Sequence, residues 1–317
     1  MQAITGMEWL KKWIKQLEVT NSKFEDDIKQ ITEIKPKVYN EFREWTPLKL
    51  ILMNYALNVC TTIIKNTSFF KKRYYVDLFA GSGINKIKGK NDDFIIGSSL
   101  ISSLNHADAY DSMIFCEKNP SYSEALDLRL KTLKKDNLTI MKKKYELCLN
   151  NIIKKVSDKN TYSFFFIDPN STEFIWDSMK KVLQVRSDII FNFMTSEIFR
   201  AVGLAKAGLS AGENLTRLFG DESWNEAYDA EELIEIYKKN ILKERPEAPI
   251  KIIRIKSKQF NFCYHLLFIT NKTKGENKWL RALDKAKKEI ESNSDVAVKN
   301  ALDIIKKRQS ELSQYCN

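Results

Sequence analysis

Tyr74-Tyr75-Val76-Asp77-Leu78-Phe79-Ala80-Gly81-Ser82-Gly83 is the stretch from which the fold of this chain can be inferred. Aromatic and β-branched residues lead into an acid and then into a turn with two glycines, which is typical of a buried parallel strand that ends in a loop. Gly81 and Gly83 permit positive φ and a close approach of the backbone to a ligand. Asp77 lies near the carboxyl end of the predicted strand, where open α/β sheets bind their ligands. The stretch therefore predicts a ligand-binding loop, with a purely structural turn between strand and helix as the alternative.

A second predicted strand also ends in an acid, because the apolar residues 112–116 run into Glu117. In nucleotide-binding folds a carboxylate at this place accepts hydrogen bonds from both ribose hydroxyls of the ligand. Glu117 follows Asp77 by 40 residues, whereas the usual spacing is about 20. The polar segment 84–93 accounts for the excess. It is interpreted either as a solvated insertion or as a mobile lid that presents lysines to phosphates, namely Lys86, Lys88 and Lys90.

A third predicted strand, 163–167, is followed by Asp168-Pro169-Asn170. Its continuous apolar run indicates burial on both faces and hence a central position in a sheet. Because open α/β sheets bind their ligands at the carboxyl ends of strands, these three residues are candidates for a ligand site. The structural alternative is that Asp168 caps the following helix, as Asp-Pro sequences often do.

The remaining pattern alternates strands with helices, which predicts a parallel sheet with right-handed crossovers. The segments 251–255 and 264–269 are too close in sequence for a parallel crossover, so we expect them to form an antiparallel pair. Other strands are predicted at 138–141 and 188–194. Helices are predicted at 7–19, 22–34, 46–65 (with Thr46 as N-cap and Pro47 at the first helical position), 97–104, 121–134, 148–156, 222–243 (exposed), 276–292 and 296–313, and the segment 203–212 is expected to be small and flexible.

Length and composition describe one elaborated globular domain. The chain has 317 residues, of which 43% are hydrophobic and 11% aromatic, enough for an ample core. We divide it into an N-terminal helical region (1–66), an α/β domain (67–275) and a C-terminal helical region (276–317). No signal peptide is expected, and no window reaches the uninterrupted apolar length of about 20 residues that a membrane span needs.

The formal net charge of +11 favours a polyanionic partner such as nucleic acid, since lysine and arginine neutralise phosphates. Most of the basic residues are lysines, which an AT-rich genome also places on solvated faces. Trp9 and Trp13 in the first helix are interpreted as core contacts, with a base-stacking platform as the alternative.

Five scattered cysteines with no C-x-x-C pair, and only two histidines, argue against a disulfide framework or a zinc site. Reduced thiols in a cytoplasm are the expected state.

Taken together, five blocks of sequence in this order resemble the three-Cys-motif partner (TcmP) family of bacterial, methyltransferase-like proteins. The similarity covers roughly residues 40–275. The five blocks are Tyr75–Gly83, Gly97-Ser-Ser-Leu100, Phe115-Cys-Glu-Lys-Asn119, Phe165-Phe-Ile-Asp-Pro169 and Asp188-Ile-Ile-Phe-Asn-Phe193. The resemblance implies an α/β, class I methyltransferase (Rossmann-like) fold, S-adenosylmethionine as cofactor and a companion protein that bears a three-cysteine motif.

The resemblance also implies roles for individual residues. Asp77 would face the amino group of the cofactor, and Glu117 would hold its ribose hydroxyls. The family-like acid that reaches the adenine falls near residues 144–145, where this chain has Lys144-Tyr145. Tyr145 stacks on the adenine, or this role is absent. The full set expected at the cofactor is Asp77, Phe79, Ala80, Gly81, Ser82, Gly83, Glu117, Lys118 and Tyr145, and no metal is expected.

Asp168-Pro169-Asn170 stands where amino-group methyltransferases have a D-P-P-aromatic motif, so the resemblance implies that these three residues hold the target amine. The main hypothesis is a methyltransferase that acts on a base amine of DNA or RNA. A second hypothesis is a non-catalytic subunit that keeps the fold and binds nucleic acid or the companion protein. A third is a methyltransferase of a protein or a small molecule.

Overall fold

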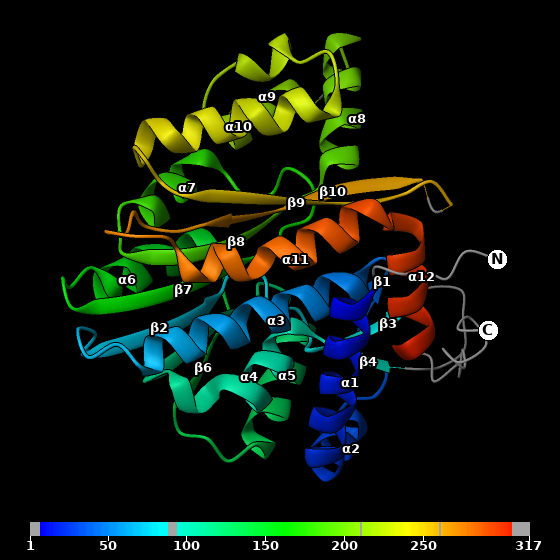
Figure 1. The fold of residues 1–317 in the computed structure, drawn as a ribbon, viewed down its shortest axis with the longest axis vertical. Helices are drawn as coiled ribbons and strands as arrows, with labels where there is room; N and C mark the ends of the chain where they lie inside the picture. The colour runs from blue at the N-terminus through cyan, green and yellow to red at the C-terminus, as the bar shows by residue number, and fades with distance from the viewer. Residues whose placement is uncertain (1–6, 88–93, 210, 260, 306–317) are drawn as a thin grey trace.

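A mostly parallel sheet of seven strands forms the centre of the computed structural model, which describes residues 7–87, 94–209, 211–259 and 261–305 (Figure 1). The strands are β2 (Lys72–Asp77), β5 (Ser112–Cys116), β6 (Leu138–Met141), β7 (Thr161–Ile167), β8 (Ser187–Phe193), β9 (Ile250–Ser257) and β10 (Phe262–Ile269). Their order is β6-β5-β2-β7-β8-β10-β9, and β10 is antiparallel to both of its neighbours. The sheet is that of a class I methyltransferase fold, and the predicted antiparallel pair is confirmed.

The three acids predicted at strand ends follow neighbouring strands. Asp77 lies beside Phe115 of β5 and Phe166 of β7 in the register of the sheet. Glu117 and Asp168 come directly after those two strands. All seven residues of β7 are buried, as the continuous apolar run predicted for a central strand.

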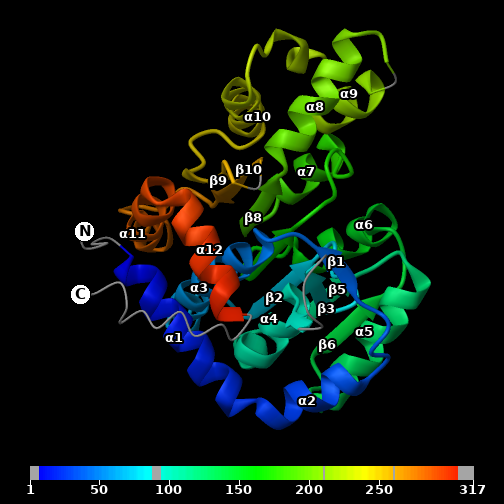
Figure 2. The same ribbon diagram turned by 90° about the vertical axis from the view of Figure 1, so that its right-hand side faces the viewer.

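Helices cover both faces of the sheet, and neighbouring strand residues point into different layers. Figure 2 shows α3 and α11 on one side of the sheet and α6 and α7 on the other. The first layer contains α1 (Glu8–Lys23), α2 (Glu25–Glu33), α3 (Thr46–Lys65), α4 (Ser98–His106), η1 (Ala107–Ala109), α5 (Pro120–Thr132), α11 (Lys278–Ser292) and α12 (Ser294–Ile305). The second contains α6 (Tyr145–Val156), α7 (Trp176–Leu183), α8 (Thr195–Lys206), α9 (Gly212–Phe219), η2 (Ser223–Glu226) and α10 (Ala230–Glu244).

The N- and C-terminal helices share the first core layer with the sheet. Trp9 is buried there and packs edge-on against Tyr55, while the ring of Trp13 lies 4.5 Å from the same tyrosine. These two tryptophans are thus core contacts. The division of the chain into an N-terminal helical region, an α/β domain and a C-terminal helical region, at residues 66 and 275, stays a prediction.

Helix α3 contains no uninterrupted apolar run of about 20 residues, because Lys49, Asn54 and Asn58 interrupt it, but it is long and apolar enough to cross a membrane by length and composition. However, 78% of its apolar window is buried inside the protein, and core helices pass the same test. The indole nitrogen of Trp279 in α11 donates to the Ala56 carbonyl and ties the two helices together. The start of α3 at Thr46 is confirmed, but its N-cap is Trp45 and not Thr46.

The segment predicted as a polar loop after Gly83 instead contributes to a second, small sheet. Its strands are β1 (Asn40–Phe42), β3 (Ile84–Ile87) and β4 (Phe94–Ile96), in the order β1-β3-β4. Ile84, Ile87 and Ile95 of this sheet are buried. The polar residues around them in the sequence led to the wrong prediction of a loop. Lys86 is part of β3 and lies over the ring of Tyr39, while Lys88 and Lys90 lie outside the described residues.

Between β8 and β9 the chain makes a helical excursion, α8–α10, which lies at the top of Figure 1. The prediction of a small, flexible segment at 203–212 was wrong at its two ends, where α8 continues to Lys206 and α9 begins at Gly212. The prediction that 222–243 is exposed was also wrong for α10, whose Leu233, Tyr237 and Ile241 recur at helical spacing and are buried. A smaller correction concerns α6, which begins at Tyr145 rather than Cys148. The helix predicted at 296–313 is α12, which begins at Ser294, and its predicted part beyond Ile305 lies outside the described residues.

Candidate functional site

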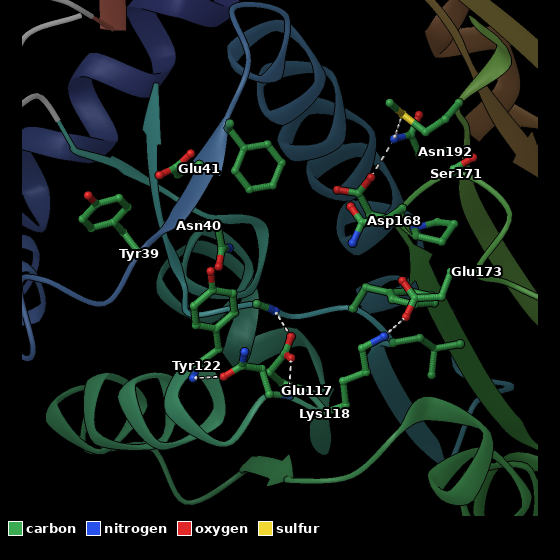
Figure 3. A pocket seen from close by; sticks show the side chains of 18 of the residues that line it. Tyr39, Asn40, Glu41, Glu117, Lys118, Tyr122, Asp168, Ser171, Glu173 and Asn192 are labelled. Atoms are coloured by element: carbon green, nitrogen blue, oxygen red, sulfur yellow. Dashed lines mark hydrogen bonds and ion pairs between the residues drawn. The ribbon is translucent and has the colours of Figure 1, made fainter. Parts of the chain in front are cut away.

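A pocket of about 850 Å³ opens at the carboxyl ends of the central strands. It is bounded by the segment 37–45, the glycine turn after β2, the start of α5 and the turns after β7 and β8. Figure 3 shows Glu117 and Lys118 on one side of it, Asp168 and Asn192 on another, and Tyr39 to Glu41 on a third. Open α/β sheets bind their ligands outside the carboxyl ends of the strands, at the point where the strand order reverses.

Glu117 is fixed by backbone donors. The Gly81 N–H donates to its Oε2 (2.9 Å), and the Asn119 N–H donates to its Oε1 (2.7 Å). Each carboxylate oxygen has a second lone pair, so Glu117 retains acceptor capacity while its position is set from both sides. The start of α5 supports this arrangement, because Asn119 caps the helix and Pro120 is its first residue.

Asp77 does not line the pocket. Its fully buried carboxylate accepts hydrogen bonds from the Phe79 N–H (3.1 Å) and the Ser98 hydroxyl (3.1 Å). Burial raises the pKa of Asp77 to about 7, and the two hydrogen bonds only partly oppose this. In this conformation Asp77 joins the strand end to α4, so the predicted contact with the amino group of a cofactor would have to pass through water or a movement of the loop.

The two glycines of the turn serve different neighbours. Gly81 has φ +63°, lines the pocket, and a Cβ there would lie 2.3 Å from the Asn40 amide nitrogen. Gly83 has φ +81° and faces the core, where a Cβ would lie within 3 Å of both Leu126 and Leu100. Of the two glycines, only Gly81 offers its backbone to a ligand.

The N-terminal segment 34–42 is clamped onto this turn. The buried guanidinium of Arg129 donates to the Ser82 carbonyl (2.5 Å) and to the carbonyls of Ile34, Lys35 and Val38. The Asn40 amide oxygen accepts a hydrogen bond from the Ser82 N–H (3.0 Å). Arg129 thereby holds β1 at the rim of the pocket.

Asp168 forms an ion pair that the sequence did not suggest. The Lys49 ammonium of α3 lies 2.5 Å from its Oδ2, and the Asn192 amide nitrogen of β8 donates to its Oδ1 (2.6 Å). Only 5% of the Lys49 side chain and 13% of the Asp168 side chain are exposed. The amide oxygen of Asn192 is buried and has no partner among the described residues. Both oxygens of Asp168 thus already have donors.

The turn after Asp168 lines the pocket with Pro169, Asn170 and Ser171. Asn170 is exposed, and Ser171 has a positive φ of 47°, so the backbone reverses sharply here. No helix follows directly, because α7 begins at Trp176. The alternative that Asp168 caps the following helix is therefore wrong.

Tyr145 lines the pocket but is 4% exposed and strongly held. Its hydroxyl donates to the Glu173 carbonyl and accepts from the Ile175 N–H, and its ring packs against Phe79 and Phe174. Burial raises its pKa to about 12. Phe79 covers part of the Tyr145 ring. Stacking of Tyr145 on an adenine stays a prediction.

Lys118 forms an ion pair with Glu173, which raises the pKa of the lysine. This pair links the start of α5 to the turn after β7 at the rim of the pocket (Figure 3).

The structure brings most of the predicted site residues to one pocket. The lining includes Phe79, Gly81, Glu117, Lys118, Tyr145, Asp168, Pro169 and Asn170, and it does not include Asp77, Ala80, Ser82 or Gly83. The backbone N–H of Ala80 donates to the Cys116 carbonyl, and the Ser82 hydroxyl donates to the Ile84 carbonyl, so these residues shape the turn from behind.

Sequence reasoning missed four residues that build the site: Asn40, Lys49, Arg129 and Asn192. Two of them had a detectable signal. Lys49 is the only charged residue between Pro47 and Lys65 of an apolar helix, and Asn192 interrupts the apolar run of β8. Because an unpaired charge or amide is costly to bury, such positions indicate a buried partner.

No protein-family model matches the sequence, and no curated protein matches it. Among solved structures, protein LPL1258 from Legionella pneumophila has a TM-score of 0.50 at 9% identity, over 77% of this chain and 91% of that one. The O-methyltransferase from Bacillus cereus in complex with SAH scores 0.42 at 9% identity, over 69% and 80%. An rRNA methylase from Streptococcus thermophilus scores 0.37 at 8% identity, over 69% and 95%. At 9% identity the similarity to protein LPL1258 supports the fold alone. The two structures with TM-scores below 0.5 carry no argument.

Proposed function

We propose that this protein is a methyltransferase that uses S-adenosylmethionine and acts on a base amine of a nucleic acid. The observation that carries the proposal is Glu117. Its carboxylate lies at the carboxyl end of β5, anchored by the Gly81 N–H, at the wall of a pocket of about 850 Å³. An acid in this place of an α/β sheet is suited to two vicinal ribose hydroxyls.

The residues around Glu117 fit the cofactor at its ribose and at its sulfur end. Phe79 and Leu78 supply apolar surface beside Glu117, while the absence of a side chain at Gly81 makes room for the Asn40 side chain. When bound, the cofactor supplies an activated methyl group on a sulfonium ion. The chain contributes alignment, because the amine must be held with its lone pair directed at that methyl group.

The substrate half of the pocket supports an amine with the Pro169 carbonyl and the Asn170 side chain. The role that we propose for Asp168 differs from the predicted contact with the amine. Lys49 neutralises its carboxylate, and the Asn192 amide nitrogen donates to its other oxygen. We assign Asp168 the role of fixing Asn192, whose unpaired amide oxygen is an additional acceptor for the amine once the side chains adjust. The net charge of +11 supports a nucleic acid as the carrier of that amine.

The test is transfer of tritium from methyl-labelled S-adenosylmethionine to DNA and RNA oligonucleotides. We expect label in nucleic acid with the wild type and with Asp108→Ala, a control that removes an exposed aspartate. Asp168→Ala should transfer no label while still binding the cofactor. Binding to the oligonucleotide should weaken steeply with salt, as phosphate contacts require. Absence of both binding and label, in a protein that binds the cofactor, would move the substrate to a protein or a small molecule.

A second candidate is a non-catalytic subunit, and the Lys49–Asp168 ion pair favours it, because a methyltransferase acid that is already paired is less available to a substrate. The absent acid at residues 144–145 points the same way. The resemblance to the TcmP family suggests a companion protein with a three-cysteine motif as its partner, and the four described cysteines, which are free, fit a cytoplasmic location.

The effect of Asp168→Ala distinguishes the enzyme from the non-catalytic subunit. A non-catalytic subunit should keep its biological effect and capture its companion in a pull-down when Asp168 is replaced by alanine. An enzyme should lose its effect in the same variant.

A further inference from the structure

Three side chains with metal-binding atoms, none of which lines the pocket, gather on the side of the sheet that faces the helical excursion. Cys263 and His265 are two residues apart on β10 and so point to the same face, while Glu231 comes from the first turn of α10. One ligand atom from each of the three lies within 4.8 Å of the others. The His265 Nε2 and Glu231 Oε2 atoms are already 3.3 Å apart.

We propose that Glu231, Cys263 and His265 bind a divalent transition-metal ion of zinc type. A thiolate, an imidazole and a carboxylate are the ligand types that zinc prefers, and three protein ligands leave a fourth position for water. Bonds of about 2.0–2.3 Å place tetrahedral ligands roughly 3.3–3.8 Å apart. The histidine and the glutamate already meet that spacing, and a small movement closes the shell on the cysteine.

The atoms behind the ligands are arranged to orient them. The Thr195 hydroxyl lies 2.6 Å from the His265 Nδ1 and also within hydrogen-bond distance of the Phe193 carbonyl. When that hydroxyl donates to the carbonyl, it accepts from Nδ1–H, so the Nε2 lone pair is directed at the cluster. A second partner of this kind is usual for metal-binding histidines.

Glu231 is oriented in the same manner. The Arg254 guanidinium donates to its Oε1 (3.1 Å), which leaves Oε2 directed toward His265. The backbone of Cys263 is fixed as well, because its N–H donates to the Ser196 hydroxyl (2.7 Å). Arg254 and Lys256 lie opposite His265 and Cys263 on β9. Their charges oppose a dication, and they are offset by the carboxylate and by the thiolate that forms when the metal displaces the thiol proton.

The proposed site would tie α10 to β10 and so hold the excursion to the sheet beside its edge strand β9. It differs from the expectation from sequence that no zinc site exists. That expectation looked for paired cysteines, whereas this cluster combines C-x-H on a strand with an acid from a preceding helix.

The experiment uses the full chain, stripped with a chelator and titrated with Co²⁺. We expect one equivalent to bind with a near-ultraviolet thiolate-to-cobalt charge-transfer band, which Zn²⁺ then removes by displacement. Cys263→Ser should abolish the band, and Glu231→Gln should weaken binding by at least about tenfold. Cys148→Ser and Glu235→Gln, which change the same residue types elsewhere, should behave as the wild type.

No charge-transfer band in the wild type, or a band that survives Cys263→Ser, would overturn the proposal. In that case the histidine ring donates Nε2–H to Glu231, and the cluster is a hydrogen-bonded contact. The outcome is independent of cofactor binding, so it separates from the fate of the proposed methyltransferase.

Discussion

Glu117 and Asp168 both follow a central strand, and both line the same pocket, but they are held in opposite ways. Glu117 receives two backbone N–H groups, from Gly81 and Asn119, which belong to the turns of the fold itself. Asp168 is held by two side chains, Lys49 and Asn192, which come from α3 and β8. The half of the pocket proposed for the cofactor is therefore held by backbone groups, whereas the half proposed for the substrate depends on a buried ion pair that single substitutions can remove.

The largest effect is expected from breaking that ion pair. Asp168→Ala leaves the Lys49 ammonium buried without its partner and should reduce the free energy of unfolding by about 3–5 kcal/mol. The double variant Lys49→Met with Asp168→Ala should recover most of this loss. Urea denaturation measures both, with Glu276→Ala, which removes an exposed ion pair with Arg281, as a control that should change stability by less than about 1 kcal/mol. A loss at Asp168 no larger than in the control would show that the two halves of the pocket are held alike.

A pH-dependent effect is expected at Asp77, which lies behind the glycine turn and does not line the pocket. Its folded pKa is raised from 3.8 to about 7, so between these values the native state binds a proton that the unfolded state has lost. The stability contributed by Asp77 is therefore fully present below about pH 4 and falls by up to about 1.4 kcal/mol per pH unit until pH 7. Asp77→Asn should flatten that part of the stability curve, measured by denaturation at several pH values. An unchanged slope would mean that Asp77 is ionised in the folded protein throughout this range.

The smallest effect is expected at the rim, where the Lys118 side chain is 54% exposed in its pair with Glu173. Lys118→Met should change stability by less than about 1 kcal/mol, because exposed ion pairs contribute little. Cofactor affinity should change less than about threefold if the backbone around Glu117 sets the cofactor half. A tenfold loss in calorimetry would instead make Lys118 a direct ligand contact.

The two halves also differ in how far the sequence predicts them. The strand, acid and glycine-turn pattern placed Asp77, Gly81 and Glu117 correctly in the fold, because strand ends and tight turns are determined by local sequence. Local sequence did not show that Asp77 turns inward to Ser98, since α4 begins 21 residues later.

The substrate half was predicted less well because its contacts are distant in sequence. Lys49 and Asp168 are 119 residues apart, so only the folded chain shows that they pair. Helices α8 and α9 escaped prediction for a related reason, since small residues conceal the helical spacing that buries Leu215 and Leu218 of α9. The helix α10 was predicted.

The most direct measurement is calorimetric titration of the full chain with S-adenosylmethionine and with S-adenosylhomocysteine, in the wild type, Glu117→Ala and the control Glu124→Ala. Glu124 lies on α5, the helix that follows Glu117, and forms an exposed ion pair with Lys35. We predict one site with micromolar affinity in the wild type and the control. Binding to Glu117→Ala should be about 100-fold weaker, since two hydrogen bonds to a charged group are lost. No binding to a folded wild type, or equal binding to Glu117→Ala, would contradict the assignment of the pocket to the cofactor.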